Sequence, residues 1–130
     1  MRGRPSFSLK ARARSFRFAW RGVVFVLRGQ HNAWIQSAAT VSVVATGLLL
    51  RVSYLEWALL ALAMLAVWVA EAFNTALETL GDAVSADEHP LVGVAKDASA
   101  GAVLLSAIAA AIVGCLVFLP RIAAVIRSVW

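Results

Sequence analysis

The chain has 130 residues, of which 62% are hydrophobic and 15% are charged, and it carries a formal net charge of +5. A soluble domain is closer to half apolar and a quarter charged, and a core of this size cannot hold the excess. The composition therefore excludes an ordinary soluble domain and predicts a single all-α membrane domain over residues 1–130. The basic residues indicate a cytoplasmic flank beside anionic membrane lipids, and we expect no nucleic-acid partner.

Residues 6–28 are predicted to form a helix at the membrane surface. At 100° per residue its basic side chains gather on one side, and apolar side chains lie broadly opposite, as in interfacial helices. The basic residues are Lys10, Arg14, Arg17, Arg21 and Arg28, and the apolar ones are Leu9, Phe16, Ala19, Val23 and Leu27. The same stretch is rich in Arg, contains Ser and lacks acidic residues, so a mitochondrial targeting segment is the alternative interpretation.

Three segments are predicted to cross the membrane, at residues 33–50, 55–80 and 98–119. The apolar part of the second, residues 57–70, is too short for a span of ~20 residues, so the helix must continue through the polar stretch that follows. We expect Pro120 and Arg121 to end the third, and Cys115 within it to be a small packing residue. Gly81, His89-Pro90 and several charges predict a loop over 81–97.

Lysine and arginine counts give the orientation. With the N-terminus inside, nine basic residues lie on the inner side and three on the outer side. This asymmetry predicts a multi-pass protein of the cell inner (plasma) membrane, with a cytoplasmic N-terminus, a cytoplasmic 81–97 loop and an outside C-terminus.

Four polar residues follow one another on the second span. Glu71, Asn74, Glu78 and Asp82 fall within about 80° of the helical wheel, and Glu71 lies ~21 Å along the helix from Trp57. An unpaired carboxylate at that depth costs roughly 2.5 kcal/mol or more, so the stripe is expected to face other protein or a wet cleft. One explanation is a polar seam between helices, centred on Asn74. The other is a cation site, for which oxygen ligands alone suggest magnesium.

Other polar residues carry less information when taken singly. Lys96 and Asp97 are consistent with a snorkelling lysine and a helix cap, and His89 with an exposed loop residue. A mostly small-residue face in the third span indicates helix packing. Its members are Ser99, Ala102, Ser106, Ala109 and Val113.

Two segments together carry a resemblance. "EAFNTALETLGD" followed by "EHPLVGVAKDASAGAVLL", with "FRFAWRG" and "HNAWIQ" before them, resembles the prokaryotic diacylglycerol kinase family, which includes undecaprenol kinases. The similarity covers nearly the whole chain. It implies a homotrimeric membrane lipid kinase that uses ATP and Mg²⁺ to phosphorylate a lipid alcohol, either diacylglycerol or undecaprenol.

The resemblance also implies roles for individual residues. Glu71 would be the general base, Asn74 would support it, and Glu78 would hold magnesium. The residues implied to lie near the nucleotide are Phe18, Asp82, His89, Lys96 and Asp97. The family usually has a second metal-binding glutamate where this chain has Gln30, and Trp34 and Gln36 also depart from the family pattern.

A non-catalytic membrane protein is the rival interpretation, either an ion or proton conduit or an assembly subunit. A conduit needs polar groups along its whole length, whereas residues 57–69 offer none. Polar residues confined to the inner half of the span favour a site that is entered from the cytoplasm.

Overall fold

The structure is a computed structural model that describes residues 9–29, 31–84 and 89–129. Within those residues it consists of four helices and contains no strand, which confirms the all-α class. The helices are α1 (Leu9–Gly29), α2 (His31–Leu49), α3 (Tyr54–Val84) and α4 (Pro90–Val129).

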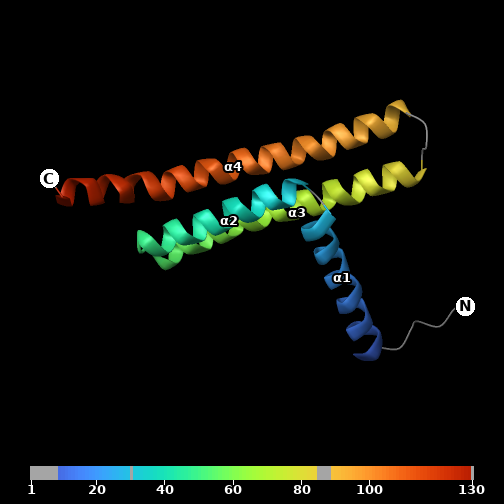
Figure 1. Cartoon of the computed structure of the whole chain (residues 1–130), viewed down its shortest axis with the longest axis horizontal. Coiled ribbons are helices and arrows are strands. Elements are labelled where there is room, and N and C mark those ends of the chain that lie inside the picture. Colours follow the sequence, from blue (N-terminus) through green and yellow to red (C-terminus); the bar gives the residue numbers. More distant parts are fainter. Residues whose placement is uncertain (1–8, 30, 85–88, 130) are drawn as a thin grey trace, which may run out of the picture.

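A long antiparallel pair, α3 and α4, forms the body of the molecule (Figure 1). The helix α2 lies along the first half of α3, and α1 leaves this layer at a steep angle. At 1.5 Å per residue the 31 residues of α3 extend ~46 Å and the 40 residues of α4 ~60 Å, which exceeds a ~30 Å hydrocarbon layer. Among the described residues, α3 and α4 are long and apolar enough to cross a membrane, and a crossing by α2 remains a prediction.

The turn between α2 and α3 is fixed by hydrogen bonds at both helix ends. Val52 N donates to Gly47 O at 3.1 Å and Arg51 N donates to Leu48 O at 3.3 Å, which closes α2 with Arg51 in the left-handed region at φ 49°. Ser53 N then donates to Glu56 Oε2 at 2.6 Å, and Glu56 N donates to Ser53 Oγ at 3.4 Å, as in a capping box.

A charged cluster ties α4 to this turn. Arg121 Nη2 donates to Glu56 Oε2 at 2.5 Å, and Arg121 Nη1 donates to the carbonyl of Arg51 at 2.9 Å. Arg121 on α4 therefore bonds both the first turn of α3 and the turn that follows α2.

The helix ends differ from the sequence-based expectation. Most of the predicted 81–97 loop is helical, because α3 continues to Val84 and Pro90 begins α4, where a proline is well tolerated since the first N–H has no helical partner. The fourth helix also runs through Pro120 to Val129, since an internal proline removes one hydrogen bond without forcing a stop. The helix predicted over 6–28 is described from Leu9 to Gly29, and residues 6–8 lie outside the described part.

Few side chains are buried by the helices themselves. Apolar burial in the described residues is limited to Val26, Ala33, Val52, Leu60 and Val117. Gly47 permits one close approach, because an added Cβ would lie 2.7 Å from the indole ring of Trp57. Most large apolar side chains face outward, as expected of helices that expose them to lipid.

Candidate functional site

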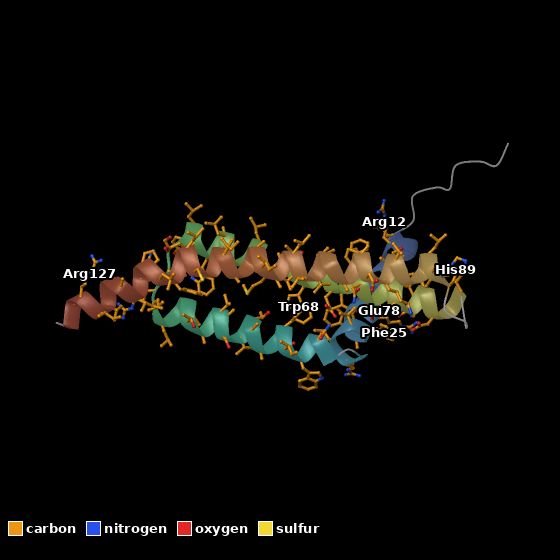
Figure 2. The ribbon with its side chains drawn as sticks, turned by 90° about the horizontal axis from the view of Figure 1, so that it is seen from above. Arg12, Phe25, Trp68, Glu78, His89 and Arg127 are labelled. Carbon is orange, nitrogen blue, oxygen red and sulfur yellow. The ribbon has the colours of Figure 1, made fainter. Side chains whose placement is uncertain are left out.

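Burial falls steadily along the polar stripe of α3. Glu71 is 1% exposed and Asn74 is 4% exposed, whereas Glu78 is half-buried and Asp82 is exposed. The stripe therefore runs from the interior of the helix layer to the end of α3. Figure 2 places His89 at one end of the molecule and Arg127 at the opposite end, with Glu78 between Trp68 and His89.

The deepest carboxylate is held by α2. Gln36 Nε2 donates to Glu71 Oε2 at 3.0 Å, across 35 residues of sequence. One turn further along α2, Trp68 Nε1 donates to Thr40 Oγ1 at 3.1 Å. Two side-chain hydrogen bonds therefore join α2 to α3 beside the buried acid.

The middle of the stripe is held by α4. Ser99 Oγ lies 2.6 Å from Asn74 Oδ1 and 2.8 Å from the carbonyl oxygen of Lys96, and Asn74 Nδ2 donates to Glu78 Oε1 at 2.9 Å. Asn74 thus links a buried serine on α4 to a half-buried carboxylate on its own helix. This contact holds one carboxylate oxygen of Glu78, Oε1.

At the end of α3 the stripe meets a cation. Lys96 Nζ donates to Asp82 Oδ1 at 2.5 Å. The absence of a side chain at Gly81 lets Lys96 reach across α3 to Asp82, because an added Cβ would lie 2.8 Å from Lys96 Cε and 2.9 Å from Val92 Cγ1. The lysine stem therefore lies directly against the backbone of α3.

The three acids of the stripe do not converge on one another. Glu71 is bonded to Gln36, Glu78 to Asn74 and Asp82 to Lys96. Within the residues that the structure describes, no group of three or more His, Cys, Asp or Glu side chains is placed to hold a metal ion. The donor chemistry of Glu78 still fits magnesium, because this ion takes only one or two protein carboxylates and fills its shell with waters and phosphate oxygens.

Phe18 and Asp97 lie outside this network of contacts. The exposed ring of Phe18 on α1 has the guanidinium carbons of Arg17 and Arg21 at 5.8 and 5.9 Å from its centre. Asp97 is exposed on α4, beside Lys96. Gln30 lies outside the described residues.

His89 has a structural contact of its own. Leu91 N donates to its Nδ1 at 3.3 Å, and the backbone of Val92 donates to its carbonyl at 2.9 Å. These bonds cap the first turn of α4. His89 therefore fixes where α4 begins, two turns before Lys96.

Two residues of the network were not predicted as site residues. Ser99 was interpreted as part of a small packing face, and Gln36 only as a departure from a family pattern. The signal available for Ser99 was its place in the first turns of the predicted third span, near Lys96. Nothing in the sequence indicated that Gln36 contacts Glu71, because that contact depends on how α2 packs.

An apolar groove lies beside the buried acid. Its volume is about 470 Å³, and it is lined by α2, α3 and α4. Gln36, Thr40 and Trp68 are among its lining residues, and most of the others are apolar. Gln36 therefore belongs both to the groove and to the contact with Glu71.

Comparison with known proteins identifies relatives that match most of this chain in sequence. A family model described as prokaryotic diacylglycerol kinase matches residues 17–118. The chain is 44% identical over 107 residues to a diacylglycerol kinase of Synechocystis sp., covering 82% of this chain but only 61% of that relative. It is 37% identical over 109 residues to an undecaprenol kinase of Bacillus subtilis, covering 84% and 89% of the two chains.

A third relative is less similar in sequence. A diacylglycerol kinase of Helicobacter pylori is 28% identical over 109 residues, covering 78% of this chain and 85% of the relative. The family match includes the whole polar stripe of α3 and both Lys96 and Ser99. The chain belongs to the prokaryotic diacylglycerol kinase family.

Proposed function

We propose that this protein is a lipid kinase, which transfers the γ-phosphoryl group of ATP to the hydroxyl of a membrane lipid alcohol with the help of magnesium. The observation that carries the proposal is the buried Glu71 carboxylate, bonded to Gln36 beside an apolar groove and connected by the stripe to a half-buried lysine, Lys96. A lipid hydroxyl and a water-soluble nucleotide can then approach the site from different sides. Family membership supports the same activity.

Glu71 acts as the general base in this scheme. The lipid O–H bond breaks and its proton passes to the Glu71 carboxylate, while the lipid oxygen bonds the γ-phosphorus. The bond from that phosphorus to the bridging oxygen breaks, and ADP leaves. Phosphoryl transfer depends mainly on positioning and on neutralising charge, so one well-placed base suffices.

The part of the stripe nearest the proposed cytoplasmic side, at Glu78 and Asp82, would bind the nucleotide and its metal ion. Glu78, which Asn74 holds and which Ser99 reaches only through Asn74, would be the main magnesium ligand, with the amide of Gln30 as a weaker one. When bound, magnesium supplies positive charge that offsets the charge of the phosphates. In the structure Lys96 pairs with Asp82. Because lysine binds phosphate as a flexible point charge, Lys96 would leave this carboxylate and bind a phosphate of the nucleotide.

Further residues complete the nucleotide site in this proposal. Asp97 would position the nucleotide beside Lys96, Phe18 would lie near the adenine, and His89 would hold the start of α4 in place. Phe18 and Asp97 lie outside the network within one chain. A homotrimer, in which neighbouring copies complete each site, would bring such residues together.

The lipid substrate is either diacylglycerol or undecaprenol. The relatives from Synechocystis and Helicobacter carry the first name, and the relative from Bacillus carries the second. Both lipids present a primary hydroxyl attached to long hydrocarbon chains, so both suit a base that lies beside an apolar groove.

The membrane arrangement is also a proposal. The protein would cross the inner (plasma) membrane with α2, α3 and α4, keep α1 on the cytoplasmic surface, and place its C-terminus outside. The nine basic residues on the inner side support this orientation. A conduit is disfavoured because the outer half of α3, residues 57–69, has no charged side chain.

The test is purified protein supplied with labelled ATP and each lipid alcohol in turn. Loss of a general base typically lowers turnover 10²–10⁴-fold, roughly the loss expected for Glu71→Gln. Glu56→Gln is the control for general destabilisation, since it makes the same change at the far end of the same helix, where it weakens the pairing with Arg121. Near-normal turnover in Glu71→Gln, or no labelled lipid from the native protein, would contradict the proposal.

A further inference from the structure

Only one of the two polar atoms of the Gln36 side-chain amide has a hydrogen-bond partner among the described residues. Its Nε2 donates to Glu71 Oε2 at 3.0 Å, while its Oε1 is buried and has no hydrogen-bond partner among the described residues. Buried carbonyl oxygens are rarely left without a donor, and an exception in a native protein calls for an explanation. The unpaired oxygen lies on the residue that touches the proposed base.

An amide and a carboxyl group can bond in two ways. When the acid is ionised it only accepts hydrogen bonds, so it needs the amide N–H₂. When the acid has taken up a proton it donates through its O–H, so it needs the amide oxygen instead. A glutamine can serve both states by turning its terminal amide half a revolution, without gaining or losing a proton itself.

We propose that Gln36 is a positioning residue that holds Glu71 in both states of the reaction. This inference rests on the proposed kinase function. Before transfer, Gln36 Nε2 fixes the carboxylate so that its free oxygen faces the lipid hydroxyl. As the lipid proton reaches Glu71, the amide turns and Gln36 Oε1 accepts the new O–H, until the acid releases its proton to water.

The unpaired oxygen is what allows this turn. A rotating amide normally gives up the bonds of both edges, but here Oε1 has no bond to lose within the described residues. The turn therefore exchanges one hydrogen bond to Glu71 for another. The bond between Trp68 and Thr40 already joins α2 to α3 one turn away, so helix packing does not depend on Gln36 alone.

Two substitutions at Gln36 test the inference. Gln36→Met keeps the length and removes both edges, and it should lower kcat roughly 10- to 100-fold with little change in the KM for lipid or ATP, as for a lost hydrogen bond to a charged group. Gln36→His offers one ring donor and one ring acceptor at similar reach, and it should recover most of that loss.

Gly47→Ala is the control, because an added Cβ would lie 2.7 Å from the ring of Trp57 and would disturb the α2–α3 packing away from both Glu71 and the groove. It should keep kcat while lowering thermal stability. If Gly47→Ala lowers kcat as much as Gln36→Met, the effect comes from helix packing and the inference is wrong. Normal kcat in Gln36→Met would overturn it as well.

A double variant separates this inference from the proposed function. If Gln36 acts through Glu71, adding Gln36→Met to Glu71→Gln should not reduce the residual turnover further. An additional tenfold loss would show that Gln36 acts elsewhere. Near-normal turnover in Glu71→Gln alone would instead overturn the proposed base, whatever happens at Gln36.

Discussion

Ser99 offers a direct way to test whether the contact between α3 and α4 controls the magnesium ligand. Ser99→Ala removes the donor at 2.6 Å from Asn74 Oδ1. Ser99 is 7% exposed and Asn74 is 4% exposed, so water cannot easily replace the lost hydroxyl. A buried acceptor left without a donor costs about 1–3 kcal/mol. If about 1.4 kcal/mol of this loss falls on turnover, the rate falls about tenfold.

The assay is a magnesium titration at fixed ATP. Because Asn74 also donates to Glu78 at 2.9 Å, a freed Asn74 should raise the magnesium concentration that gives half-maximal rate. Alanine favours helices, so α4 itself should stay formed. Ser106→Ala is the control, since it makes the same change two turns further along the same face. Superimposable titrations of the native protein and Ser99→Ala would refute the reasoning.

Three further predictions concern other parts of the chain. Gly81→Ala should displace the Lys96 side chain, at a cost of about 1–3 kcal/mol of overpacking, and should raise the KM for ATP severalfold. Gly93→Ala, where an added Cβ meets nothing within 4 Å, should leave that KM unchanged, and equal KM values in the two variants would contradict the prediction. Glu78→Gln should lose turnover that added magnesium partly restores, and a loss that no magnesium concentration changes would exclude a metal role. A periplasm-active reporter should be active after residue 130 and silent within residues 85–88, and the reverse pattern would invert the topology.

The sequence was sufficient for those features that depend on periodicity along one helix. The shared face of Glu71, Asn74, Glu78 and Asp82 follows from 100° per residue. Within the structure, burial decreases from Glu71 to Asp82. The capping box of Ser53 and Glu56 was not predicted, although it too lies within four residues. Such features need no knowledge of the neighbouring helices.

The helix ends were harder to predict, because the same residues act in two ways. Proline after histidine was interpreted as a loop signal, yet Pro90 occupies the first position of α4, where its missing N–H is not needed. Pro120 was expected to end the helix, yet α4 continues for nine further residues. In both cases the tolerance for proline depends on its position within the helix.

Contacts between helices were the least predictable part of the site. Ser99 bonds Asn74 across 25 residues, and Gln36 bonds Glu71 across 35. A serine on a small-residue face and a glutamine in an apolar run give no local sign of their partners. Only the packing of α2 and α4 against α3 brings these pairs together.

The small number of buried apolar side chains affects how this protein would respond to heat. Among the described residues, the buried apolar side chains are only Val26, Ala33, Val52, Leu60 and Val117, so the surrounding hydrocarbon takes over much of the role of a core. Backbone hydrogen bonds in lipid have no water to replace them, so each helix persists after its neighbours separate. Heating should therefore pull α2 and α4 away from α3 while the far-ultraviolet circular dichroism hardly changes. Inactivation would then precede any visible loss of helix.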